Sequence, residues 1–190
     1  MQPNELLCIL HTAEKLKDTT RHCCTSGGRR ESVAEHSWRL ALMAFFLRDE
    51  FPRADMDKVL RMCLIHDLGE CFTGDIPSFI KTAADEAREE RLLHAGGDAL
   101  PAPYAAEMRT LYREMAALET EEAKIYKALD KLEAVIQHNE SDLSTWTENE
   151  YSLNLTYAQG NVAFSPYLTA LRQAIRRETE EKIDREKKIK

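Results

Sequence analysis

The chain has 190 residues, of which 43% are hydrophobic and 31% are charged, a balance typical of one folded domain and not of a disordered protein. Acidic residues outnumber basic ones by 33 to 26, and the resulting charge of -7 argues against a protein whose main task is to bind nucleic-acid backbone. Ala and Leu occur 22 times each and Val only four times, so we expect an all-α, single-domain helical bundle.

Capping signals and helix breakers divide the chain into about seven helices, and no pair of strands is convincing. A loop is expected over Asp18–Arg30, where Thr, Ser, Gly and a Cys pair gather, and a turn over Thr73–Pro77. Ser32 and Glu35 have the spacing of a capping box. The expected helices are Asn4–Lys17, Ser32–Glu50, Asp55–Gly69, Ser78–His94, Pro103–Leu118, Thr120–Asn139 and a last one that begins at Pro166 after a Ser165 cap.

The expected domain covers residues 1–177, and residues 178–190 form a charged helix end or tail. No segment is apolar enough to span a membrane, because Tyr151–Leu171 lacks charges but is rich in Ser, Thr, Asn and Gln. The first residues lack the basic start and apolar core of a signal peptide. Five cysteines without a C-x-x-C pattern favour neither a disulfide framework nor a thiolate zinc site, so we expect a cytoplasmic protein.

Imidazoles and carboxylates interrupt the apolar faces of three expected helices. His36 continues the apolar spacing of the second helix and should point inward. His66 shares a stripe of the third helix, with Asp67 one step around it and Glu70 one turn further on. Asp130 lies on the flank of an apolar stripe in the helix expected over Thr120–Asn139.

Each of these signals also has a structural explanation. A single inward histidine is more often a hydrogen-bonded core residue than a ligand, and a carboxylate beside an apolar stripe is usually solvated or capped. Together they are harder to explain, because two imidazoles and two carboxylates in one small core are costly to bury unless a cation neutralises them. We therefore expect one divalent ion, with Mn, Co, Fe, Zn and Mg as candidates.

The order of these residues resembles the HD-domain metal-dependent phosphohydrolases, whose ligands come as His, His-Asp and Asp from separate helices. The flanking residues are more specific and resemble the branch that contains the bacterial 5'-deoxynucleotidases. The resemblance covers most of the chain between Arg21 and Gln137. It is carried by Glu31–Trp38, His66–Glu70, Thr73–Pro77 and Ala128–Glu133.

The resemblance implies an HD-type helical bundle in which His36, His66, Asp67 and Asp130 are the metal ligands. It assigns to Glu70 the role of the carboxylate that activates or positions the attacking water. A water bound to a divalent cation loses its proton near neutral pH, and a carboxylate one turn beyond His66 could accept that proton.

The resemblance also implies three roles around the substrate. Asp75 is a second active-site carboxylate, Arg21 binds the phosphate, and Lys81 contributes to substrate binding. His22 departs from the family pattern, since the deoxynucleotidases carry a tryptophan there that helps to exclude a ribose 2'-hydroxyl. His22 could bind the sugar or be exposed and idle, so the choice of sugar stays open. For Glu133 we favour a structural role.

The expected activity is hydrolysis of the 5'-phosphate of (deoxy)nucleoside monophosphates by a metal-activated water. The alternatives are an HD hydrolase of another small phosphate ester or nucleotide, and a non-catalytic nucleotide-binding regulator. Branches with two metals use extra histidines before the last Asp, and only His94 lies in that interval. We expect a small-molecule partner, no nucleic acid and no membrane. Whether the chain forms a homodimer stays open. Tyr151–Leu171 could pack at such an interface or in the core of its own chain.

Overall fold

The structure is a computed structural model that describes residues 1–76, 82, 84–85, 88, 91–92 and 100–187. Most of the helix expected over Ser78–His94 lies outside these residues, and so does Lys81.

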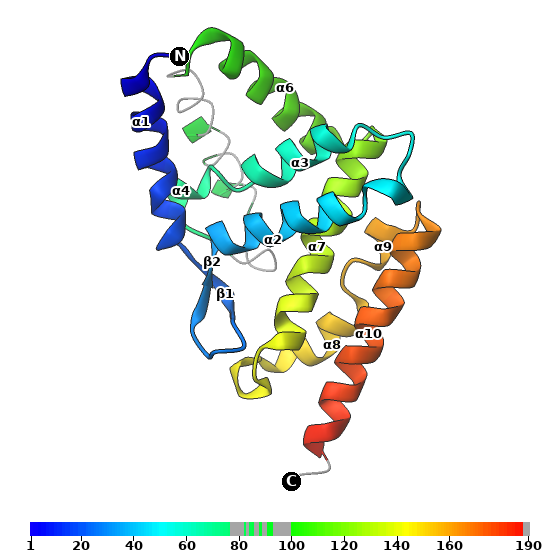
Figure 1. The fold of residues 1–190 in the computed structure, drawn as a ribbon. Helices are drawn as coiled ribbons and strands as arrows, with labels where there is room; N and C mark the ends of the chain where they lie inside the picture. The colour runs from blue at the N-terminus through cyan, green and yellow to red at the C-terminus, as the bar shows by residue number, and fades with distance from the viewer. Residues whose placement is uncertain (77–81, 83, 86–87, 89–90, 93–99, 188–190) are drawn as a thin grey trace.

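The described elements confirm an all-α bundle with one small hairpin (Figure 1). The helices of the first half are α1 (Pro3–Ala13), α2 (Val33–Phe46), α3 (Met56–Ile65) and α4 (Glu70–Thr73), with short 3-10 turns at Glu14–Lys17 and Arg48–Glu50. Those of the second half are α6 (Ala102–Ala117), α7 (Glu121–Glu140), α8 (Glu148–Thr156), α9 (Gln159–Val162) and α10 (Pro166–Lys187), with a 3-10 turn at Leu143–Thr145.

Helix α7 is the centre of the bundle and packs against α2, α3, α6 and α10 (Figure 1). Its apolar stripe, which includes Ile125, Leu129 and Leu132, is fully buried. The stripe meets Leu40 of α2 and Met62 of α3, so residues on the inward edges of these three helices come close together. This packing determines where the functional side chains lie.

The capping box before α2 is confirmed. The Ser32 hydroxyl accepts a hydrogen bond from the Glu35 N–H at 3.3 Å, and the Glu35 carboxylate accepts one from the Ser32 N–H at 2.9 Å. The cap before α10 is also present, because the Ser165 hydroxyl accepts a hydrogen bond from the Leu168 N–H at 3.3 Å.

The loop expected over Asp18–Arg30 is instead an antiparallel hairpin of β1 (Thr20–Cys24) and β2 (Arg30–Ser32). Gly28, with φ at 85°, allows the turn between the strands. The Gln137 side-chain amide of α7 donates to the Cys24 carbonyl at 2.6 Å. Because this partner lies 113 residues away, the local sequence does not reveal the hairpin.

The helix expected to run to Gly69 ends at Ile65. The Ile65 carbonyl accepts a hydrogen bond from the Leu68 N–H at 3.0 Å, which forms a tight turn, and another from the Tyr112 hydroxyl of α6. Tight turns then lead into α4, with a hydrogen bond from the Glu70 N–H to the Asp67 carbonyl at 3.0 Å. The break places His66 and Asp67 in a turn and Glu70 at the first position of α4.

The uncharged stretch Tyr151–Leu171 contributes to the core of its own chain. It forms the end of α8, all of α9 and the start of α10, and it buries Ala158, Val162 and Leu168. Helix α10 continues to Lys187, and Thr179 within it is fully buried. In the part of the chain that the structure describes, no helix has both the length and the apolar character needed to cross a bilayer.

Candidate metal centre and substrate pocket

A carboxylate with no exposed surface, that of Glu133 on α7, lies at the base of the site. Its Oε2 is 3.1 Å from Arg21 Nη1 and also contacts His36 Nδ1, while its Oε1 accepts from Arg39 Nε at 2.6 Å. Burial alone would raise the pKa of Glu133, but His36, Arg21 and Arg39 lower it to about 2. The carboxylate is therefore ionised and links β1, α2 and α7.

The contact with Glu133 orients the ring of His36. Because the carboxylate accepts, Nδ1 carries the proton, and Nε2 points away from Glu133. His36 Nε2 lies 3.3 Å from His66 Nε2, 3.4 Å from Asp130 Oδ1 and 3.9 Å from Asp67 Oδ2.

His66 is oriented in a similar way by the backbone. Its Nδ1 donates to the Cys63 carbonyl at 2.9 Å, which leaves Nε2 facing the same point, 2.9 Å from Asp67 Oδ2. The structure thus brings together the four residues that the sequence suggested as ligands, from α2, from the turn after α3 and from α7.

The donor set fits a divalent cation. In a tetrahedral zinc site with bonds of 2.0–2.1 Å, neighbouring ligand atoms are about 3.3 Å apart, close to the distances around His36 Nε2. Two imidazole nitrogens with two carboxylate oxygens also suit Mn, Fe and Co. A second acidic cluster, formed by Glu31 and Glu133 around His36, is already neutralised, because Arg21 Nη1 donates to Glu31 at 2.8 Å.

The electrostatics favour positive charge between these donors. Burial alone would raise the pKa of Asp67, but His66 and His36 lower it to about 2. Burial would likewise raise the pKa of Asp130, and Lys127, at 2.8 Å, and His36 hold it well below its usual range. Burial and Arg21 lower the pKa of His36, yet Glu133 and Asp130 raise it to about 9. The negative carboxylates that raise the pKa of His36 would attract a metal cation as well.

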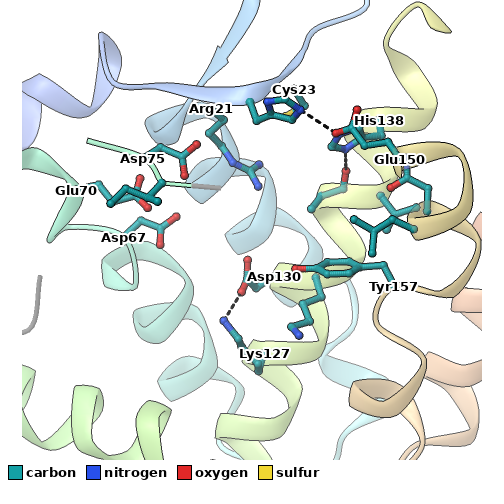
Figure 2. Close-up of a pocket in the computed structure, with 17 residues that line it drawn as sticks. Arg21, Cys23, Asp67, Glu70, Asp75, Lys127, Asp130, His138, Glu150 and Tyr157 are labelled. Carbon is teal, nitrogen blue, oxygen red and sulfur yellow. Dashed lines mark hydrogen bonds and ion pairs between the residues drawn. The ribbon is translucent and has the colours of Figure 1, made fainter. Parts of the chain in front are cut away.

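Of the four predicted ligands, Asp67 and Asp130 line a cavity of about 480 Å³, a size typical of small-molecule sites. Figure 2 shows Asp67, Glu70 and Asp75 on one side of it, and Glu150 and Tyr157 on the opposite side. The predicted site residues that line it are Arg21, His22, Asp67, Glu70, Asp75 and Asp130. Of the predicted set, Lys81 alone lies outside the described residues.

Two predicted catalytic carboxylates share the metal-ligand side of the cavity. Glu70 is 6% exposed and lines the cavity from α4. Asp75 is half-buried, and its pKa is raised by burial, although Arg21 acts in the opposite direction. A carboxyl with a raised pKa holds its proton more firmly, which suits a proton donor.

His22 is neither exposed nor idle. Its Nε2 lies 2.9 Å from Glu150 Oε1, and His138 Nε2 lies 2.9 Å from the same oxygen. Burial alone would raise the pKa of Glu150, but hydrogen bonds from His138 and the Thr147 N–H lower it to about 2. The sequence analysis missed Glu150 and His138. Thr147 and Glu150 form a capping box, which would have predicted the start of α8 but not its place in the site.

Substitution of Glu133 by Gln should destabilise the protein by about 3–5 kcal/mol, because it leaves Arg21 and Arg39 buried beside a neutral group. Glu140→Gln is the matched control. It removes another partner of Arg39, but one whose side chain is 48% exposed, so its effect should stay below about 1 kcal/mol. Urea denaturation at neutral pH measures both changes, and equal losses would contradict the central place given to Glu133.

Comparisons with known proteins agree with this geometry. The mouse (Mus musculus) protein named 5'-deoxynucleotidase HDDC2 is 36% identical over 112 residues, which are 58% of this chain and 55% of that protein. The 5'-deoxynucleotidase hdd1 of Schizosaccharomyces pombe is 27% identical over 155 residues, 73% of this chain and 77% of that one. The chain thus spans little more than half the length of the first of these relatives.

A solved structure extends the similarity to nearly the whole chain. A predicted metal-dependent phosphohydrolase from Magnetospirillum magnetotacticum superimposes with a TM-score of 0.79 at 30% identity, covering 94% of this chain and 95% of that one. The sequence profile of the HD domain matches residues 13–172. With this match over most of its length and the same bundle, the chain belongs to the HD domain family.

Proposed function

We propose that this protein is a metal-dependent phosphomonoesterase that releases phosphate from (deoxy)nucleoside 5'-monophosphates. The observation that carries the proposal is the convergence of two imidazole Nε2 atoms on two carboxylates that line a cavity. Arg21, Glu70 and Asp75 line the same cavity. The 5'-deoxynucleotidase names of the relatives and the metal dependence in the name of the structural neighbour support it.

We propose that His36, His66, Asp67 and Asp130 hold one divalent ion, with Mn, Co, Fe, Zn and Mg as candidates. Such an ion, when bound, lowers the pKa of a coordinated water and shields the negative charge of the phosphate. The mixed nitrogen and oxygen donors and the low pKa values of Asp67 and Asp130 support this role.

Arg21 is the proposed phosphate ligand. Its Nη1 meets both Glu31 and Glu133, so the guanidinium is held in one orientation at the cavity wall. Burial alone would lower the pKa of Arg21, but Glu133 and other negative groups raise it, which keeps the side chain charged. Among the described residues, Nε and Nη2 have no hydrogen bond and are available to two phosphate oxygens.

The carboxylates on the metal-ligand side divide the proton transfers in this proposal. Glu70 accepts a proton from the attacking water, and Asp75, with its raised pKa, delivers a proton to the sugar oxygen that leaves. His22, held by Glu150, forms part of the wall beside the sugar. Lys81 stays a predicted substrate-binding residue.

The alternatives are a different small phosphate ester as substrate and a non-catalytic regulator. The paired carboxylates Glu70 and Asp75 favour an enzyme, since a regulator needs no proton acceptor beside its ligand. A cavity rather than an exposed basic surface favours a small molecule over nucleic acid. We also propose a cytoplasmic location, supported by five cysteines that are all free thiols.

The decisive variant is Glu70→Ala in a phosphate-release panel of ribo- and deoxynucleoside monophosphates with Mn, Co and Mg. Turnover should fall about 10²–10⁴-fold, because the water loses its proton acceptor, while the metal content stays unchanged. The exposed Glu121→Ala variant should keep full activity. Turnover that survives in Glu70→Ala would remove this residue from the mechanism, and a wild-type protein inactive on every nucleotide would favour the alternatives. The same panel decides between ribose and deoxyribose.

We further propose a homodimer that covers the outer face of α2. Trp38, Leu42, Phe45 and Phe46 follow helical spacing there, and they are 62, 37, 47 and 71% exposed. Contiguous exposed apolar side chains of this size mark protein interfaces more often than free surface. Light scattering should give twice the 21.8 kDa chain mass, and Phe46→Asp should halve it. A wild-type monomer at micromolar concentration would contradict the dimer.

A further inference from the structure

One buried amide on the wall opposite the catalytic carboxylates has no partner. Asn154 of α8 is 3% exposed and lines the cavity. Its Nδ2 is buried and has no hydrogen-bond partner within the described part of the chain. A buried polar group that gives up water without gaining a partner destabilises the fold, so such groups are rare, and a functional role is one explanation for them.

Two hydrogen bonds from Arg172 hold the main chain around Asn154 in place. Arg172 of α10 is 3% exposed, and its Nη2 donates to the Asn154 carbonyl at 2.7 Å. Its Nε donates to the Tyr157 carbonyl at 2.6 Å. These bonds satisfy carbonyls at the C-terminal end of α8 that the helix leaves open. The main chain that carries Asn154 is thus fixed at the wall, and the buried Nδ2 of its side chain has no hydrogen-bond partner among the described residues.

The position of α8 separates this amide from the proposed metal ligands. Glu150 lies one helical turn before Asn154, on the side of the cavity opposite Asp67, Glu70 and Asp75 (Figure 2). Apolar wall is supplied nearby by Val135 of α7 and Leu153 of α8. A substrate whose phosphate meets Arg21 and the metal ligands would extend its other end toward this wall.

The carboxylate and imidazoles nearest to Asn154 on this wall already have partners. Glu150 Oε1 is shared by His22 and His138, and His138 Nδ1 donates to the Ala134 carbonyl at 2.7 Å. On α8, Glu150 is thus engaged, whereas the buried Nδ2 of Asn154 has no hydrogen-bond partner among the described residues. A carboxamide presents a donor beside an acceptor, and every nucleobase presents the complementary pair along one edge.

We propose that Asn154 binds the edge of the nucleobase and makes the enzyme prefer base-bearing phosphate esters to plain sugar phosphates. This inference rests on the proposed function, because it places the phosphate at the opposite end of the cavity. It makes Asn154 a specificity residue that plays no part in the chemical step.

The first test is a calorimetric titration of deoxyadenosine and thymidine, which carry a base but no phosphate, with 2-deoxyribose as the base-free control. Asn154→Ala should weaken nucleoside binding roughly tenfold, the effect of one or two lost hydrogen bonds. Asn149→Ala, at an exposed position of the same helix, should bind like the wild type. Nucleoside binding that is absent in the wild type, or unchanged in Asn154→Ala, would overturn the proposal.

The second test compares kcat/KM for deoxynucleoside monophosphates with that for 2-deoxyribose 5-phosphate. Asn154→Ala should lower the first roughly tenfold and leave the second unchanged. An equal loss on both substrates would assign Asn154 to structure or chemistry and overturn the proposal. If the wild type released no phosphate from any ester, the proposed function would fail, and the nucleoside titration would still decide on Asn154.

A third variant distinguishes the loss of the N–H donors from misfolding. Asn154→Asp keeps the shape of the side chain and removes its N–H donors, so it should lose nucleoside affinity like Asn154→Ala. Asn149→Asp introduces the same charge at an exposed position and should keep wild-type affinity. Retained affinity in a folded Asn154→Asp would overturn the role of the amide as donor.

Discussion

The buried carboxylate of Glu133 is the constraint on which the rest of this site depends. A carboxylate without exposed surface is stable only when positive or donating groups surround it, and here they come from β1 and α2. The same contacts orient His36 and hold Arg21 at the cavity. One residue of α7 therefore orients the His36 ring and the Arg21 guanidinium, which we propose as metal and phosphate ligands. It holds the hairpin together with Gln137 of the same helix.

The cavity has two ends with different chemistry, and each is supported by a different part of the bundle. At one end α2, α7 and the turn after α3 supply charged donors, two of them carboxylates with lowered pKa values. At the other end α8 supplies Glu150 and Asn154, and Arg172 of α10 fastens α8 by its carbonyls. A phosphate ester with a polar heterocycle at its far end matches both ends.

Local patterns in the sequence predicted those parts of the structure that local patterns determine. The spacing of His36 with apolar residues and the capping box at Ser32 gave the position and start of α2 correctly. The His66–Asp67 pair and Asp130 could be suspected because burying them without a cation is costly. Their distances required the packing of α7 against α2 and α3, which no single stretch of sequence encodes.

The features that the sequence did not reveal depend on distant partners. The hairpin over β1 and β2 is held by a hydrogen bond from Gln137, and the Tyr112 hydroxyl binds the Ile65 carbonyl at the point where the third helix ends. The start of α8 could have been predicted from its capping box, but its place beside the cavity could not. From the sequence alone, Glu133 is expected to be a charge on a helix face. Its burial is explained only by its contacts with Arg21 and Arg39. The roles of such residues can be recognised only when the tertiary contacts are known.

The most direct test of this account is the divalent metal content of the purified protein after equilibrium dialysis against Zn or Mn, measured by mass spectrometry. We expect about one ion per chain in the wild type, and almost none in folded His36→Ala and Asp130→Ala variants, because each removes a ligand from a single coordination sphere. A folded wild type that binds no ion, or variants that retain a full complement, would contradict it.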